Sequence, residues 1–271
     1  MGEINKKFAF IGCGAMGEAI LKGILAGGLV KKEQVTAGVP TAKRQAYLKE
    51  TYGIAVTGSN EEAVAQADWV VLAVKPQMAK AAVTPSVVAA MKPDAVILSI
   101  MGSYDLAMLH DLVPHHPIIR SMPNTPLSVG MGMTAITSGS DVAAEAMDIA
   151  EAVFASCGEV VRVDEKAMEA ITAISGCGPG YMFVVIDALA DAGVMAGLPR
   201  ALAIKLASQT MAGSGIMGIK TGLHPAQLRD QVTSPGGTTI AGIKALENHG
   251  VRGAFYDAVQ AVLDRSAALK K

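Results

Sequence analysis

The chain has 271 residues, which fits one large domain or two modest ones, and 51% of them are apolar, enough to build a sizeable core. Basic and acidic side chains nearly cancel, 23 against 24, which argues against general nucleic-acid binding because that needs clustered lysine and arginine. Three widely spaced cysteines, Cys13, Cys157 and Cys177, indicate a reducing compartment rather than a disulfide scaffold, and we expect a cytoplasmic protein.

Short β-branched strands alternate with alanine-rich helical stretches over the first 160 or so residues. Strands are predicted at Lys7–Ile11, Gln34–Val39, Trp69–Val74, Ala95–Ser99, Ile118–Met122, Thr134–Thr137 and Val160–Val163. Helical spacing marks Ala15–Ala26, Thr41–Thr51, Met78–Met91 and Val142–Ser156. The strands are apolar on both faces, as in a parallel sheet that helices cover on either side. These repeated units predict an α/β domain over residues 1–164 with a doubly wound, mostly parallel sheet.

The second part of the chain, residues 165–271, is predicted to be an all-helical domain. Its helical segments are Lys166–Ile174, Pro179–Ala196, Arg200–Ile219, Ala226–Val232, Thr238–Asn248 and Val251–Leu269, separated by glycine and proline clusters. These helices are rich in Ala, Gly, Ile and Met and carry few charges. Because about a hundred residues cannot easily bury so much apolar helix, we expect a second copy of the chain to cover it.

One apolar run, residues 177–198, has about the length of a membrane-spanning helix. Asp187 and Asp191 fall in its middle, four residues apart, and each carboxylate is costly at the centre of a bilayer. We therefore expect a buried or interface helix of a soluble protein, with no membrane partner.

A glycine-rich turn follows the first predicted strand. Gly12, Gly14 and Gly17 form the pattern GxGxxG between that strand and a helical stretch, which is the context of dinucleotide binding. The first glycine permits the turn, the second lets a pyrophosphate approach the backbone, and the third lets the helix pack on the strand. The alternative is a structural glycine turn without a ligand.

The end of the second predicted strand carries no acidic residue in the stretch TAGVPTAKR at 36–44. Proteins that bind NAD usually place Asp or Glu there to hold the ribose 2′-hydroxyl. Thr41, Lys43 and Arg44 offer groups that receive a 2′-phosphate instead, which favours NADP(H), with NAD(H) as the second choice. Alternatively, Lys43 and Arg44 are solvated helix residues.

Three further loops are candidates for ligand contact. Ala73–Pro76 and Ser99–Gly102 each follow a strand, at the sheet edge where ligands bind in such folds. In the first of them, Lys75 either faces a cofactor or lies in water at the strand end. Asn124, between two prolines at 123 and 126, either contacts a ligand or supports a structural turn.

The segment SPGG at 234–237 is a flexible loop that leads into a predicted helix. Exposed N–H groups at the start of that helix, together with the hydroxyls of Ser234, Thr238 and Thr239, form a receptor suited to a small carboxylate. A well-capped helix start with no ligand explains the same residues equally well.

With these motifs, the sequence resembles the Δ1-pyrroline-5-carboxylate reductase family over essentially the whole chain. The resemblance rests on IGCGAMG at 11–17, AVKP at 73–76, RSMPNTP at 120–126, AISGCGPGY at 173–181 and, above all, QVTSPGGTTIAGIKALE at 231–247. Cys177 and Gly180 stand where that family commonly has Ser or Thr and Ala, exchanges between small residues that leave the assignment intact.

The resemblance implies a Rossmann-type domain and a helical domain that dimerises by intertwining, with dimers often assembling into rings. It implies reduction of the cyclic imine 1-pyrroline-5-carboxylate to L-proline with NADPH or NADH, the last step of proline biosynthesis. The implied cofactor contacts are Ile11, Gly12, Cys13, Gly14, Ala15, Met16, Gly17, Asn60, Ala73, Val74, Lys75, Pro76, Ser99, Ile100 and Met101. The implied substrate loop holds a carboxylate on Gly236, Gly237 and Thr238, with Thr239 at the imine nitrogen and Ser234 as a second catalytic candidate.

Two rival interpretations are weighed against this one. A 3-hydroxy acid dehydrogenase with the same architecture would need a catalytic lysine or histidine in the helical part, and no lysine there lies in a recognisable motif. A non-catalytic NADP-binding sensor would have no use for the loop at 234–239. No spacing of His, Cys, Asp and Glu suggests a metal site, so none is expected.

Overall fold

The computed structural model describes residues 2–269 and divides into two compact units. The first comprises the described residues up to 177 together with 266–269, and the second is Gly178–Arg265. The predicted boundary after residue 164 lies earlier in the chain and stays a prediction.

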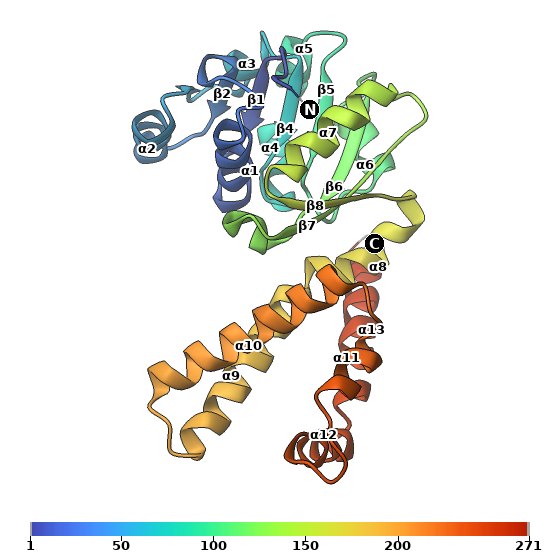
Figure 1. Cartoon of the computed structure of the whole chain (residues 1–271). Helices are drawn as coiled ribbons and strands as arrows, with labels where there is room; N and C mark the ends of the chain where they lie inside the picture. The colour runs from blue at the N-terminus through green and yellow to red at the C-terminus, as the bar shows by residue number, and fades with distance from the viewer. Residues whose placement is uncertain (1, 270–271) are drawn as a thin grey trace. The chain divides into compact units, whose positions relative to one another are not determined.

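The first unit is built on an eight-stranded sheet with the order β3-β2-β1-β4-β5-β6-β7-β8 (Figure 1). The strands are β1 (Phe8–Ile11), β2 (Val35–Gly38), β3 (Ala55–Thr57), β4 (Trp69–Leu72), β5 (Val96–Ser99), β6 (Ile118–Met122), β7 (Gly132–Ser138) and β8 (Gly158–Arg162). All neighbouring pairs are parallel except β6 and β7, which are antiparallel. The strand order reverses at β1, which is where doubly wound sheets bind their ligands. The predicted doubly wound, mostly parallel sheet is thus confirmed.

Helices cover both faces of the sheet. Successive side chains of β1 point to opposite faces, so each face of this strand packs into its own buried cluster. Phe8 and Phe10 belong to one buried cluster, whereas Ala9 and Ile11 belong to the other. The first cluster contains the apolar side of α1 (Ala15–Ala26) and α7 (Ala144–Ala155), and Phe8 stacks on Trp69 with ring centroids 5.6 Å apart. The second contains residues of α3 (Asn60–Val64), α5 (Pro85–Ala90) and α6 (Leu106–Leu112). The carboxyl edge of the sheet therefore stays open for loops.

Other helical elements of the first unit are shorter or peripheral. They are α2 (Ala42–Tyr52), α4 (Ala79–Ala82), α8 (Met168–Ile171), η1 (Lys32–Gln34), η2 (Pro76–Met78), η3 (Thr125–Val129), η4 (Glu165–Ala167) and η5 (Thr172–Gly176).

The prediction of one helix over Met78–Met91 is wrong. The chain forms η2 and α4, breaks, and starts again as α5. Pro85 causes the break because its ring clashes with a preceding helical turn and it has no N–H to donate, yet it fits the first position of a new helix. Thr84 caps this second helix, its hydroxyl accepting from the Val87 N–H at 3.4 Å. The structure also adds β3, α3 and α6, which the predicted elements omit.

The second unit contains only helices and loops among its residues, as predicted for this part of the chain. Its helices are α9 (Gly178–Met195), α10 (Arg200–Thr221), α11 (Pro225–Gln231), α12 (Thr238–Asn248) and most of α13 (Val251–Leu269). Small residues let α9 and α10 pack closely, with Ala190, Ala203 and Ala207 buried between them. Asp191 on α9 forms an ion pair with Arg200 at the start of α10. Large apolar side chains on these two helices are left exposed, among them Phe183, Val184, Met195 and Ile219.

One helical run, Glu165–Met195, is long and apolar enough to cross a membrane by length and composition, with a mean hydropathy of 1.4. Only 17% of its most apolar stretch is buried within the chain. Such a run is weak evidence by itself, since interface helices of soluble oligomers have the same composition. The absence of a membrane partner stays a prediction.

Candidate active site

The glycine turn after β1 has the geometry that phosphate binding requires. Gly12 has φ +76°, and a Cβ there would lie 2.6 Å from Val74 Cγ1, so no other residue fits without strain. Gly17 packs against Ala73, where a Cβ would lie 3.0 Å from the alanine methyl. In contrast, a Cβ on Gly14 would meet nothing within 4 Å. Gly14 therefore faces open space, and a ligand can approach its backbone.

Helix α1 begins at Ala15, and its N-cap residue, Gly14, supplies no side-chain cap. The first N–H groups of the helix therefore point outward without a side-chain acceptor, and the helix dipole favours an anion beside them. An uncapped helix start after a bare glycine suits a pyrophosphate better than it suits a purely structural turn.

Backbone hydrogen bonds link the other predicted loops in a row at the carboxyl edge of the sheet, beside the glycine turn. The Ala73 N–H donates to Ile11 O at 2.9 Å, and the Ile100 N–H donates to Leu72 O at 3.2 Å. The N–H of Gly12 donates to Gly38 O at 2.9 Å, which joins the turn to the end of β2. The predicted cofactor loops at 11–17, 73–76 and 99–101 are therefore adjacent in the structure.

The predicted cofactor residues differ in how far they are exposed. The side chains of Ile11, Cys13, Ser99 and Met101 are buried. The hydroxyl of Ser99 accepts from the Met101 N–H at 3.2 Å and so shapes its own loop. Gly14, Ala15 and Lys75 are exposed, and Met16, Ala73, Val74, Pro76 and Ile100 are half-buried.

Asn60 lies beside Gly38, the last residue of β2. A Cβ on Gly38 would lie 2.5 Å from Asn60 Oδ1, so only glycine allows the amide to lie this close. Asn60 Nδ2 donates to Ala82 O at 2.9 Å, which fixes the side chain. Asn60 begins α3, and Ser59 caps that helix through the Glu62 N–H. Asn60 therefore belongs to the same edge as the glycine turn.

The residues expected at a 2′-phosphate lie at the start of α2. Thr41 and Lys43 are exposed. Arg44 is partly buried, and its Nε and Nη2 donate to Cys13 O at 2.9 and 2.6 Å. Arg44 Nη2 also donates to Glu18 on α1, and the guanidinium lies 5.0 Å from the centroid of the Tyr47 ring. Arg44 is thus not a free surface residue, since it ties α2 to the glycine turn.

Sequence reasoning missed Glu18. Its Oε1 accepts from Tyr47 Oη and Tyr52 Oη, both at 2.8 Å, while its Oε2 accepts from Arg44. Burial alone would raise the pKa of Glu18, but the hydrogen bonds from Arg44, Tyr52 and Tyr47 outweigh it and hold the pKa below its usual value. The only signal in the sequence was an acid in the first turn after the glycines.

Asn124 supports a structural turn. Its Nδ2 donates to Ser175 O at 3.0 Å, and its Oδ1 accepts from the Met133 N–H at 2.9 Å. Asn124 is only 8% exposed, and both polar atoms of its side chain are hydrogen-bonded within the protein. Of the two alternatives left open for this loop, the structure thus favours the structural one.

Cys13 and Cys157 are buried thiols rather than activated nucleophiles. Burial raises the pKa of the Cys13 thiol to about 11 and also raises that of Cys157. Residues 2–269 contain no group of three or more His, Cys, Asp and Glu side chains that could hold a metal ion.

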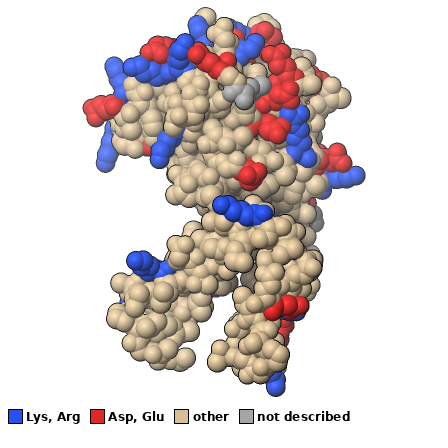
Figure 2. Space-filling view, in the orientation of Figure 1, with Lys and Arg blue, Asp and Glu red and all other residues tan. Residues whose placement is uncertain are grey.

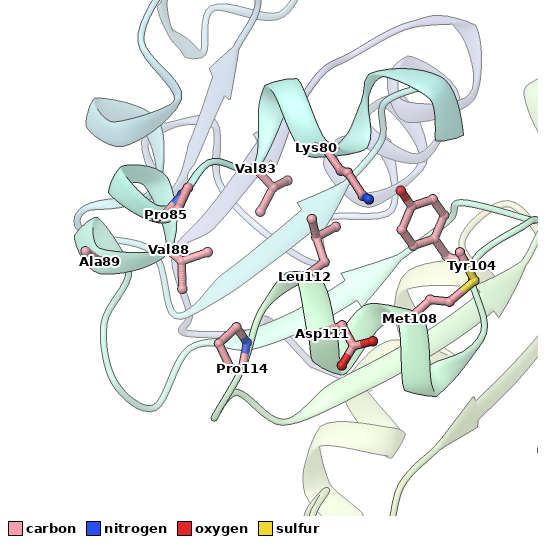
Figure 3. Close-up of a pocket in the computed structure, with 10 residues that line it drawn as sticks. All are labelled: Lys80, Val83, Pro85, Val88, Ala89, Tyr104, Met108, Asp111, Leu112 and Pro114. Carbon is pink, nitrogen blue, oxygen red and sulfur yellow. The ribbon is translucent and has the colours of Figure 1, made fainter.

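A separate groove of about 670 Å³ lies in the first unit between α4–α5 and α6 (Figure 3). Lys80 and Tyr104 line it together with Asp111 and apolar side chains such as Val88 and Leu112. None of the residues that line this groove belongs to the predicted site.

In the second unit, the loop Ser234–Thr239 forms a tight turn before α12. Gly236 has φ +69°, and the Gly237 N–H donates to Ser234 O at 3.0 Å. A Cβ on Gly237 would lie 2.4 Å from Ser234 Oγ, so any larger residue there would displace the serine hydroxyl. Gly237 is the N-cap residue of α12 and supplies no side-chain cap, and Ser234, Thr238 and Thr239 are exposed. The alternative of a well-capped helix without a ligand is therefore disfavoured.

The doubly wound sheet, its glycine turn and the adjacent strand-end loops define a dinucleotide-binding oxidoreductase fold. Residues 7–103 match a family of NADP oxidoreductases described as coenzyme F420-dependent. Residues 165–269 match the pyrroline-5-carboxylate reductase dimerisation family.

Full-length relatives narrow this class to one family. Pyrroline-5-carboxylate reductase of Synechocystis is 43% identical over 98% of this chain and 98% of its own, and that of Escherichia coli is 38% identical over 99% and 100%. A crystal structure of Plasmodium falciparum pyrroline carboxylate reductase with NADP bound has a TM-score of 0.86 at 35% identity, covering 100% of both chains. The chain belongs to the pyrroline-5-carboxylate reductase family, which these comparisons favour over the dehydrogenase and sensor alternatives.

Proposed function

We propose that this protein reduces 1-pyrroline-5-carboxylate to L-proline with NADPH. The observation that carries the proposal is the start of α12 after Gly237, where the exposed hydroxyls of Ser234, Thr238 and Thr239 accompany the first N–H groups of a helix without a side-chain cap. Dinucleotide binding accounts for the glycine turn of the first unit, and binding of the substrate carboxylate accounts for the loop Ser234–Thr239. Family membership joins the two in one reaction.

The cofactor is proposed to lie along the carboxyl edge of the sheet. The N–H groups at the start of α1 hold the pyrophosphate, and Gly14 lets it approach because nothing stands within 4 Å of a Cβ there. Asn60, Ala73–Pro76 and Ser99–Met101 contact the rest of the molecule, mostly through backbone groups. Thr41, Lys43 and Arg44 attract the 2′-phosphate, which makes NADPH the preferred cofactor and NADH the weaker one.

The protein's own work in this reaction is positioning and charge placement. When bound, the reduced nicotinamide supplies a hydride for the imine carbon. The backbone at Gly236, Gly237 and Thr238 holds the substrate carboxylate. The hydroxyl of Thr239 hydrogen-bonds the imine nitrogen and stabilises its protonated form, which is the better hydride acceptor, while Ser234 shapes the turn through its contact with Gly237.

The helical unit is proposed to form a homodimer, with dimers assembling into a ring. Exposed Phe183, Val184 and Met195 on α9, which are 63%, 69% and 86% exposed, are too apolar for a free surface. Figure 2 shows the charged side chains gathered on the α/β unit and sparse on the visible face of the helical unit. Burying this surface against a second copy also explains the apolar run Glu165–Met195 without a membrane. We place the protein in the cytoplasm.

The proposal is tested by following the loss of reduced-nicotinamide absorbance with pyrroline-5-carboxylate, in parallel with NADPH and NADH. Imine-dependent loss that is faster with NADPH is the expected result. No loss with either cofactor, from folded protein that binds NADPH, would overturn the proposed reaction.

A further inference from the structure

Glu18 and Arg44 form a partly buried ion pair at the junction of the glycine turn and α2. The Glu18 side chain is 20% exposed and the Arg44 side chain 28%. Hydroxyls of Tyr47 and Tyr52, both on α2, donate to the same carboxylate at 2.8 Å. Arg44, Tyr47 and Tyr52, all on α2, thus donate to the same carboxylate on α1. An ordinary surface ion pair has one donor residue.

Hydrogen bonds to Cys13 and Glu18 occupy two of the three guanidinium nitrogens of Arg44. Its Nε donates to Cys13 O, and its Nη2 donates to both Cys13 O and Glu18. Among the residues that the structure describes, Nη1 has no partner, so one of the three nitrogens keeps its hydrogens for a ligand. The guanidinium is held in place by its other edge and by the Tyr47 ring.

The charge of Glu18 persists at neutral pH, because its hydrogen bonds to Arg44, Tyr52 and Tyr47 outweigh burial and keep its pKa low. Arg44 is therefore accompanied by a full negative charge in direct contact. An anion that approaches Arg44 meets the field of a nearly neutral pair rather than that of an isolated cation.

We propose that Glu18 is a specificity-determining residue that limits the preference for NADPH over NADH by offsetting the charge of Arg44. The inference rests on the proposed function, in which Arg44 attracts the 2′-phosphate. The two cofactors differ only by that phosphate, so a charge at this place acts on one of them and leaves the other almost unchanged. The acid that NAD-binding proteins carry at the end of β2 is absent here, and Glu18 brings an acid to the same region from α1.

Glu18→Gln tests the proposal. The amide keeps the size of the side chain and removes the negative charge. It keeps one of the two acceptor oxygens, for either Arg44 or the two tyrosines, and places an NH2 group at the position of the other. We expect the dissociation constant for NADPH, measured by quenching of protein fluorescence or by calorimetry, to fall about threefold to tenfold. The constant for NADH should stay within about twofold, and the gain for NADPH should shrink as salt screens the charges.

Glu50→Gln is the matched control, because Glu50 is an exposed acid further along α2 and its loss changes the net charge of the chain equally. It should leave the ratio of the two constants unchanged. Arg44→Met supplies a second arm and should weaken NADPH while sparing NADH, even if Glu18→Gln does not fold.

The outcomes separate the two proposals. An unchanged or reduced NADPH preference in folded Glu18→Gln, or unchanged NADPH binding in Arg44→Met, would overturn the role of the pair. Failure of the unmodified protein to bind either cofactor would instead overturn the proposed function.

Discussion

Arg120 Nη1 donates to Glu165 Oε1 at 2.6 Å, and this bond joins β6 to η4, where the chain leaves the sheet. The arginine side chain is only 4% exposed, so its charge needs a nearby carboxylate, and its Nη2 also donates to Gly102 O at 3.2 Å. Glu165 Oε1 also accepts from the Leu106 N–H at 3.1 Å, which adds the start of α6 to the junction. A single acid therefore holds three elements together.

Glu165→Ala should lower the free energy of unfolding by about 1.5–3 kcal/mol, since it leaves a buried guanidinium without its charged acceptor. Urea unfolding measures this directly. Glu3→Ala, which breaks an exposed ion pair with Lys31, is the control and should be indistinguishable from the unmodified protein. Equal effects of the two variants would contradict the structural role of Glu165.

Alanine should have different effects at Gly12 and at Gly14 of the turn. Gly12→Ala places a Cβ 2.6 Å from Val74 Cγ1 at a positive φ, so we expect a loss of about 1–3 kcal/mol of stability. Gly14→Ala meets nothing within 4 Å and should fold with unchanged stability. It should nevertheless weaken NADPH binding at least tenfold, because the methyl group occupies the approach to the backbone. Normal NADPH affinity in Gly14→Ala would show that the pyrophosphate lies elsewhere.

Alkaline stability should depend on Cys13. Burial raises the pKa of its thiol from 9.0 to about 11, so the folded protein keeps a proton that the unfolded chain releases. This contribution to stability is complete below pH 9 and is lost as the pH rises to about 11. Over that range, the denaturation midpoint of the unmodified protein should fall more steeply than that of Cys13→Ala. Parallel curves for the two proteins would rule out this titration.

Thr239 should matter for turnover and not for cofactor binding. Thr239→Ala removes the hydroxyl proposed at the imine nitrogen, and we expect kcat to fall about a hundredfold with the dissociation constant for NADPH unchanged. Thr233→Ala is the control, since that hydroxyl donates to the Arg229 and Asp230 carbonyls at the end of α11. Near-normal kcat in Thr239→Ala would remove the residue from the mechanism.

Short apolar runs, helical spacing and glycine spacing made the main architecture predictable. β1 is apolar on both faces, because Phe8 and Phe10 enter one cluster and Ala9 and Ile11 the other, and this is the pattern of a covered parallel strand. The glycine turn was predictable for a similar reason, since Gly12 is required by its φ of +76° and by its closeness to Val74. Burial of a strand on both faces and a positive φ each restrict which residue types fit, so both can be recognised in the sequence.

Features that depend on distant partners were not predictable in this way. β3 has three residues, too few to show a period, and it is held mainly by pairing with β2. α6 has a recognisable cap, Asp105 accepting from the Met108 N–H at 2.9 Å, but only seven residues follow it. Glu18 meets Arg44 across 26 positions of the chain, and only the fold brings them together.

The central claim is hydride transfer from NADPH to the imine carbon, and isotope labelling tests it most directly. The protein would be incubated with pyrroline-5-carboxylate and NADPH that carries deuterium at the transferable position of the nicotinamide. The account predicts L-proline with one deuterium for each cofactor oxidised, on the ring carbon beside the nitrogen that does not carry the carboxylate. Cofactor oxidation without deuterated proline, or no reaction from folded protein that binds NADPH, would contradict it.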